Sequence, residues 1–163
     1  MAAQAALTGH LVLSTLHTND APSGVTRLQD LGLPSYLIRT SVAGIVAQRL
    51  VRTLCPHCKE KVETDPIEWQ DLVAPWKAKA PSHVYVAKGC NECRDTGYLG
   101  RQGLYEIMPI SREIKALITE NSDVNLIKQQ AFKEGCYPLR LAGAQAVANG
   151  VTSVEEVLRV VPF

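Results

Sequence analysis

The sequence predicts an α/β fold that carries an inserted metal module and ends in a group of helices. Three observations lead to this prediction. A continuous apolar run at residues 11–16 is typical of a strand that is covered on both faces of a parallel sheet. Two C-x2-C pairs are separated by 31 residues. After residue 110, apolar residues recur at helical spacing behind capping residues.

The first strand leads into a polar run. The strand at residues 11–16 is preceded by helix-forming residues at 1–7 and the pair Thr8-Gly9. It is followed by the polar residues His17, Thr18, Asn19 and Asp20. Because ligands of open α/β sheets bind at the carboxyl ends of strands, this run is a candidate site for a polar ligand. The alternative is that Asp20 only caps the helix that begins at Ala21-Pro22.

The remaining elements follow from caps, stops and periodicity. Glycines 32, 135 and 150 stand where helices are expected to stop. The pattern predicts strands at 48–54 and 104–108, and helices beginning near Asp20, Pro34, Asp65, Ser111, Ser122, Pro138 and Thr152-Ser153. The helix after Asp65 carries Trp69 and Trp76, and we expect both tryptophans to cover the metal module.

The two C-x2-C pairs predict a structural zinc site. Each pair forms a tight turn that directs two thiolates to one centre, and the four sulfurs together can surround Zn²⁺. Two disulfides, a redox pair or core cysteines are the alternatives, but a disulfide within either pair would leave the two turns unconnected. His57 is expected to be a solvated turn residue, and Cys136 a small buried residue. The predicted zinc ligands are Cys55, Cys58, Cys90 and Cys93.

Composition excludes several classes of protein. The 163 residues are 46% hydrophobic with a net charge of +1, which is typical of a globular protein. No apolar run approaches the ~20 residues that span a bilayer, so we predict a soluble, cytoplasmic protein that reaches membranes only through partners. Residues 55–93 hold five lysines and six acidic residues, and four thiolates around Zn²⁺ add more negative charge. A nucleic-acid-binding zinc ribbon is therefore disfavoured.

No phosphate-binding loop is encoded in these residues. Glycines occur at 97, 100 and 103, but neither G-x-x-x-x-G-K-[ST] nor G-x-G-x-x-G occurs in the 163 residues. We therefore expect the chain alone neither to bind ATP tightly nor to hydrolyse it.

Several motifs resemble the secretion ATPases that drive type II secretion and type IV pilus assembly. Residues 8–19 (TGHLVLSTLHTN) are similar to the histidine box of that family. Residues 47–56 (AQRLVRTLCP) and the tetracysteine pairs are similar to its assembly and export branch. The same holds for Gly100-Arg101, Tyr105-Glu106, residues 150–152 (GVT) and residues 155–158 (EEVL). The retraction branch lacks the tetracysteine module.

The resemblance implies a RecA-like motor that uses ATP and Mg²⁺ as a ring homo-hexamer at the inner membrane, with the secretion or pilus platform proteins as partners. It also implies that the phosphate-binding loop, the acidic Walker B residues and the arginines that reach across subunits lie ahead of Met1. The chain would then divide into the C-terminal portion of the RecA-like core (1–54), the tetracysteine insertion (55–93), the returning strand (94–110) and a C-terminal helical subdomain (111–163).

The resemblance also assigns candidate roles near the nucleotide. His17 is the first candidate to polarise the γ-phosphate or its attacking water, and His10 is the second. Thr15, Asn19 and Arg27 are candidates for the nucleotide site or a subunit boundary, with a surface ion pair as the alternative for Arg27.

A competing interpretation is a non-enzymatic zinc-binding interaction module. Residues 90–97 (CNECRDTG) resemble the C-x2-C-x-G-x-G repeat of the chaperone cysteine-rich domain. That family uses four such repeats, whereas this chain has two dissimilar pairs.

Overall fold

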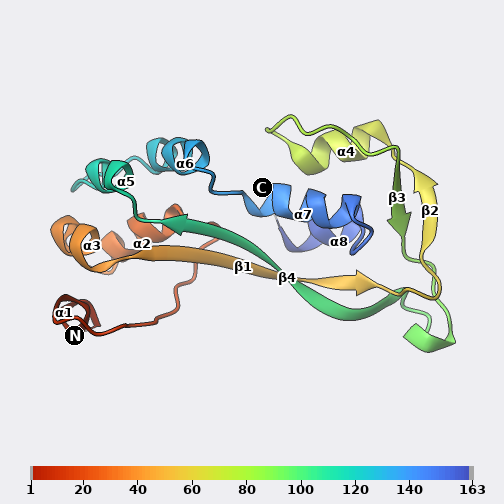
Figure 1. Cartoon of the computed structure of the whole chain (residues 1–163), viewed down its shortest axis with the longest axis horizontal. Coiled ribbons are helices and arrows are strands. Elements are labelled where there is room, and N and C mark those ends of the chain that lie inside the picture. Colours follow the sequence, from red (N-terminus) through yellow and green to blue (C-terminus); the bar gives the residue numbers. More distant parts are fainter. Residues whose placement is uncertain (1, 162–163) are drawn as a thin grey trace. The chain divides into compact units, whose positions relative to one another are not determined.

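The computed structural model describes residues 2–161 and shows a mixed α/β chain (Figure 1). Its elements are α1 (Ala2–Leu7), α2 (Ser23–Asp30), α3 (Ser35–Ser41), β1 (Gly44–Leu54), β2 (Glu60–Glu63), α4 (Pro66–Val73), β3 (His83–Val86), the 3-10 helix η1 (Asn91–Cys93), β4 (Tyr98–Pro109), α5 (Arg112–Leu117), α6 (Val124–Lys133), α7 (Leu139–Ala148) and α8 (Val154–Val160). None of the helices within residues 2–161 has the length and apolar character needed to cross a membrane.

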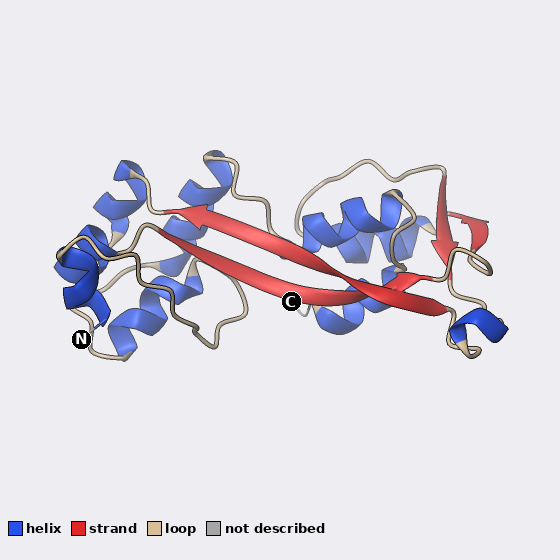
Figure 2. Cartoon of the chain, turned by 60° about the horizontal axis from the view of Figure 1, so that its bottom comes forward, coloured by secondary structure: helices blue, strands red, loops and turns tan. Residues whose placement is uncertain are grey.

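The strands form two separate two-stranded sheets. The long strands β1 and β4 pair with each other and run in opposite directions, and β2 pairs antiparallel with β3 (Figure 2). Residue contacts divide the chain into two compact units. The first contains the residues up to Ala47 together with Glu106–Tyr137, and the second contains Gln48–Tyr105 and the residues from Pro138 onwards. Each long strand therefore contributes to both units.

The first unit contains α1, α2, α3, α5 and α6 together with the first residues of β1 and the last residues of β4. In it, α3 packs against α1 and α2, and α6 packs against α2 and α5. Its fully buried side chains include Ala21, Val25, Ile38, Met108, Ile114, Ile118 and Ile127. Burial of the larger of these side chains is the main stabilising contribution, at roughly 1.5–3 kcal/mol for each.

The second unit combines the cysteine turns with α4, α7 and α8. Helix α7 packs against α4, α8 and β3. A Cβ atom at Gly143 would lie 2.3 Å from Cγ1 of Val157, so the close approach of α7 and α8 requires glycine at this position. The core of this unit contains Val51, Leu72, Val84, Leu104, Val147 and Val157.

Most of the predicted helix signals are confirmed. The side chains of Asp65, Ser111 and Ser153 accept backbone N–H groups at the starts of α4, α5 and α8. The prediction for α6 is wrong by one residue, because Asp123 caps the helix whereas Ser122 binds the N–H of Thr119. The predicted strands at 48–54 and 104–108 are confirmed, and both extend further than the sequence pattern indicated.

The predicted strand at residues 11–16 is wrong. Residues 10–18 have no regular secondary structure, and Leu11 and Leu13 are 88% and 86% exposed. A strand covered on both faces needs neighbouring strands. In the part of the chain that the structure describes, β1 pairs with β4 and β2 with β3, and neither sheet supplies a neighbour for this run.

The prediction for the tryptophan helix is also wrong in its packing. Helix α4 joins the end of β2 to the start of β3, whereas the cysteines lie beyond the opposite ends of these strands (Figure 1). Trp69 is buried, and its indole N–H donates to the carbonyl of Ala78. The helix packs against α7 and α8 and does not cover the cysteines.

Glu156 is a fully buried acidic residue between two arginines of the second unit. Its carboxylate accepts hydrogen bonds from the backbone and guanidinium groups of Arg52 and from the guanidinium group of Arg159. The Arg52 guanidinium also stacks 4.0 Å from the centre of the Tyr98 ring. Burial alone would raise the pKa of Glu156, but the hydrogen bonds from Arg159 and Arg52 outweigh it and lower this pKa to about 2.

This lowered pKa predicts a specific pH dependence of stability. A carboxylate whose pKa falls on folding contributes its full stabilisation when the pH is above the carboxylate's ordinary pKa of 4.5. This contribution is lost as the pH falls towards 2. We expect Glu156→Gln to lower the free energy of unfolding at neutral pH by about 3 kcal/mol, and the difference to shrink steadily between pH 4.5 and 2. Urea unfolding at several pH values tests this, with the exposed neighbour variant Glu155→Gln as control. A constant difference across that pH range would contradict the prediction.

Candidate metal centre

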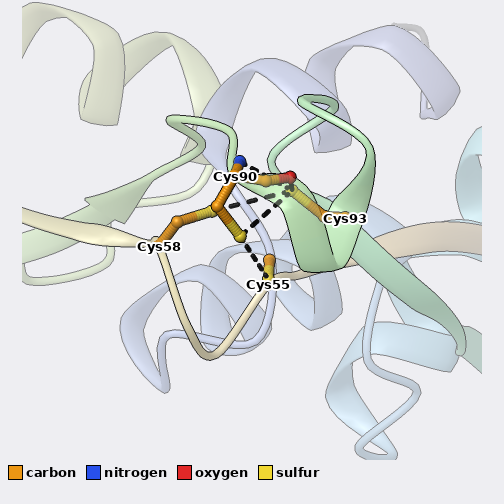
Figure 3. A group of neighbouring side chains, drawn as sticks. All are labelled: Cys55, Cys58, Cys90 and Cys93. Carbon is orange, nitrogen blue, oxygen red and sulfur yellow. Dashed lines mark hydrogen bonds between the residues drawn. The ribbon is translucent and has the colours of Figure 1, made fainter.

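The four predicted ligand cysteines converge on one point. Cys55 and Cys58 lie on the turn between β1 and β2, Cys90 directly precedes η1, and Cys93 is the last residue of η1 (Figure 3). Their sulfur atoms all lie within 4.8 Å of one another. The Sγ separations are 3.9 Å for Cys55–Cys90 and 3.8 Å for both Cys58–Cys93 and Cys90–Cys93.

These separations fit a tetrahedral zinc centre. Zinc–thiolate bonds of about 2.3 Å place the sulfurs of a tetrahedron about 3.8 Å apart. The donor set also fits, because four thiolates select zinc or iron over hard cations such as Mg²⁺. All five cysteines are free thiols in the structure, so the alternative of disulfide pairs does not describe it. The four cysteines can therefore hold one metal ion.

Local backbone bonds shape both turns. In the first turn, the carbonyl of Cys55 accepts the N–H of Lys59 at 3.0 Å, and in the second the carbonyl of Cys90 accepts the N–H of Asp95 at 2.9 Å. The N–H of Cys55 donates to the carbonyl of Gly97 at 2.9 Å, which joins the two turns. Gly97 has a φ of 74°, and a Cβ atom there would lie 2.6 Å from Cβ of Ala87. Glycine is required at this position.

Backbone N–H groups point at the sulfurs and distinguish the thiols. Burial and the neighbouring thiols raise the pKa of Cys58 to about 12, although the N–H of Gly89 donates to its sulfur at 3.3 Å. Burial also disfavours the Cys93 thiolate, but N–H groups of Cys90 and Gly97, each 3.2 Å from this sulfur, lower the pKa of Cys93 to about 6. Cys93 therefore becomes a ligand-competent thiolate at a lower pH than Cys58 does.

Residues next to the first cysteine turn are hydrogen-bonded to the loop between α7 and α8. The Lys59 ammonium donates to the carbonyl of Gly150 at 2.8 Å, and the N–H of Leu54 donates to the carbonyl of Val151 at 2.8 Å. Tyr98, next to the second turn, is hydrogen-bonded to the Ser153 hydroxyl at 2.6 Å. The helices of the second unit are thus attached to the cysteine turns by specific bonds.

The predictions for His57 and Cys136 agree with the structure. His57 is exposed on the first turn. Cys136 is buried in the first unit, 8% exposed, and burial followed by the charges of Glu106 and Asp20 raises its pKa to about 11. A thiol with this pKa is protonated and unreactive at neutral pH.

The predicted nucleotide-site residues lie on the surface of the first unit. His10, Thr15, His17, Asn19 and Arg27 are all exposed. His10 Nδ1 is 3.0 Å from the Thr8 hydroxyl.

The sequence analysis did not predict a buried polar contact at Ala21, just after the histidines. Glu106 is 5% exposed, and its Oε1 accepts the N–H of Ala21 at 2.9 Å. The signal was present, because Leu104, Glu106 and Met108 occupy alternate positions on one strand and therefore share its buried face.

The sequence is similar to a known protein family and to several curated relatives. The family described as "Type II/IV secretion system protein" matches residues 1–159. The chain is 53% identical over 163 residues to the type IV pilus assembly ATPase TfpB of Acinetobacter baylyi, covering 100% of this chain and 28% of that protein. It is 46% identical over 161 residues to type II secretion system protein E of Pseudomonas aeruginosa, covering 98% and 31%.

A third relative, the type II secretion system ATPase E of Vibrio cholerae, is 43% identical over 160 residues, covering 98% of this chain and 31% of that protein. The chain therefore spans about three tenths of the length of these relatives. The family match covers nearly the whole chain and includes the cysteine turns. The resemblance to a chaperone-like module involved only the C-x2-C pairs, so the family match is the stronger of the two. The chain belongs to the type II/IV secretion system protein family.

Proposed function

We propose that this chain is the C-terminal portion of a hexameric, RecA-like ATPase that powers type II protein secretion or type IV pilus assembly. The observation that carries the proposal is the similarity over the whole chain to relatives that are named as ATPases of these two systems. Two relatives of the assembly and export type share 53% and 46% of their aligned residues with it, so the similarity extends far beyond the cysteines.

Zinc is the proposed resident metal, and its role is structural. Four thiolates close the coordination shell, so no position remains for a substrate or a reactive water. The chain's own residues support this role, because the turns that carry the ligands also hold the α7–α8 loop through Lys59 and Leu54. The metal would therefore fix the C-terminal helices of the second unit.

The histidine segment at residues 10–18 is the proposed link to the nucleotide. ATP with Mg²⁺ would supply the phosphoryl group that is transferred to water, and His17 would stabilise charge on the γ-phosphate. The 88% and 86% exposure of Leu11 and Leu13 supports the view that this segment packs against another part of a longer protein. Proteins of the membrane platform would anchor the hexamer at the cytoplasmic face of the inner membrane.

The chain alone is expected to bind ATP weakly and not to hydrolyse it. Tight nucleotide binding in such motors needs the backbone amides and lysine of a phosphate-binding loop, and that pattern does not occur in these 163 residues. A chimera in which the chain replaces the aligned segment of the Acinetobacter baylyi ATPase is expected to hydrolyse ATP.

Calorimetry on the chain and steady-state ATPase rates of the chimera measure both expectations. The control is a chimera in which Cys55, Cys58, Cys90 and Cys93 are all replaced by serine. It shows how a chimera behaves when the inserted segment is present but not correctly folded. Micromolar ATP affinity of the isolated chain would refute the first expectation. A folded chimera without ATPase activity would refute the proposed function.

A further inference from the structure

The C-terminal end of the histidine segment is attached to the folded part of the first unit through Ala21. Residues 10–18 have no regular secondary structure, whereas Ala21, four positions after His17, has no exposed surface. The N–H of Ala21 donates to Oε1 of Glu106 on β4 at 2.9 Å. The donor and acceptor belong to residues 85 positions apart in the sequence, and both are buried.

The residue before Ala21 is attached by two further bonds. Asp20 accepts the N–H of Ser23 at 2.9 Å through Oδ1, and its Oδ2 lies 2.7 Å from the Lys128 ammonium on α6. The sequence prediction that Asp20 is the N-cap of the following helix is not met, because Pro22 is the N-cap of α2. Asp20 nevertheless accepts the N–H of the first helical residue, Ser23, and also reaches a second helix through Lys128. Residues 20 and 21 are thus held by β4 and α6 together.

The charges of Glu106 and Asp20 also act on one buried residue of this unit. Both carboxyl groups act electrostatically on Cys136, which lies between α6 and α7 along the chain. Three segments distant in sequence, at residues 20–21, 106 and 128–136, therefore meet where the histidine segment joins the unit. A hydrogen bond between buried groups is costly to break, because the donor is then left without its partner and without water to replace it.

We propose that Glu106 is a positioning residue for His17, supported by the Asp20–Lys128 ion pair. This inference rests on the proposed function, because His17 acts on a phosphate only in the complete ATPase. Glu106 acts on this segment through the backbone N–H of Ala21. It fixes the end of the segment that carries His17, so that the imidazole is presented from a rigid attachment point.

The ATPase chimera provides the kinetic test. Small displacements of a catalytic group cost up to a hundredfold in rate, so we expect Glu106→Leu to lower kcat by roughly tenfold to a hundredfold, with KM for ATP changing less than about threefold. Glu106→Gln keeps a side-chain oxygen that can accept the Ala21 N–H, and we expect it to retain kcat within about threefold. Lys128→Met, at a 45% exposed side chain, removes only the supporting ion pair, and a smaller loss of kcat is expected.

Amide hydrogen exchange on the 163-residue chain gives a readout that does not depend on activity. We expect the Ala21 amide to exchange slowly in the unchanged chain and in Glu106→Gln, and at least tenfold faster in Glu106→Leu. Glu134→Leu is the matched control in the same unit, since the Glu134 side chain bonds to Ser111 and Gln130 and not to the segment. Its exchange at Ala21 and its kcat should stay unchanged.

The outcomes separate the two proposals. An unchanged chimera that folds without ATPase activity overturns the proposed function and this inference with it. An active chimera in which folded Glu106→Leu keeps the unchanged kcat overturns only the positioning role. If Glu106→Leu does not fold, Lys128→Met decides, and a normal kcat in that variant with fast exchange at Ala21 contradicts the inference.

Discussion

One zinc ion is expected to bind per chain, and replacing a single ligand is expected to abolish stable binding. Binding of structural zinc is worth roughly 10–16 kcal/mol in small zinc peptides, and much of it becomes folding free energy. Cys93→Ser removes the thiol whose pKa is lowered to about 6 and leaves three ligands. We expect Cys93→Ser protein to lose its metal during purification. Elemental analysis of freshly purified, reduced protein measures the metal content.

The fifth cysteine provides the control for this prediction. Cys136 lies in the other unit and is not among the four clustered sulfurs, so Cys136→Ser should retain one zinc per chain. Absence of metal from the reduced, unchanged protein would refute the zinc site. Full zinc content in Cys93→Ser would show that the four cysteines do not act as one centre.

The contacts of the cysteine turns also predict where chelation acts. Lys59 and Leu54 bond to the carbonyls of Gly150 and Val151, so losing the metal should loosen the α7–α8 loop together with the turns. Helices α7 and α8 belong to the same unit as the cysteines, whereas α5 and α6 belong to the other unit. Hydrogen exchange after chelation is expected to increase at Val151 and to stay unchanged at Ile127.

Short-range signals in the sequence were the most reliable guides to this structure. The spacing of Cys55, Cys58, Cys90 and Cys93 predicted their convergence, because each C-x2-C turn is built by its own backbone bonds. The caps at Asp65, Ser111 and Ser153 were predictable for the same reason. Each cap and each single turn is determined within about five residues of chain, whereas the convergence of the two turns also uses the bond from the N–H of Cys55 to Gly97.

Features that depend on distant partners were not predictable in this way. The apolar run at 11–16 has the pattern of a buried strand, yet a strand is formed only where another strand can bond to it. The packing of α4 against α7 and α8 and the bond from Glu106 to Ala21 each join residues far apart in the sequence. Periodicity could place Glu106 on a buried face, but it could not identify the N–H that the side chain accepts.

His17→Ala in the ATPase chimera is expected to lower kcat on the order of a hundredfold while nucleotide affinity changes little. If His17 stabilises charge on the γ-phosphate mainly in the transition state, its removal affects the rate far more than ground-state binding. One positioned donor of this kind contributes about 3 kcal/mol to catalysis. Steady-state ATPase rates normalised to folded hexamer, together with calorimetric ATP affinities, measure the two effects separately.

The structure makes this experiment cleaner than the sequence suggested. His17 is exposed and lies outside regular secondary structure, so its replacement removes no packing from the first unit and should leave the stability of the chain unchanged. His10→Ala is the matched comparison, since His10 is also exposed and its contacts go to Thr8 and Ala5 at the end of α1. A hundredfold loss in His17→Ala and near-normal turnover in His10→Ala would assign the phosphate to His17. Near-normal turnover in His17→Ala would exclude it, and His10 would then be the remaining candidate of the histidine segment.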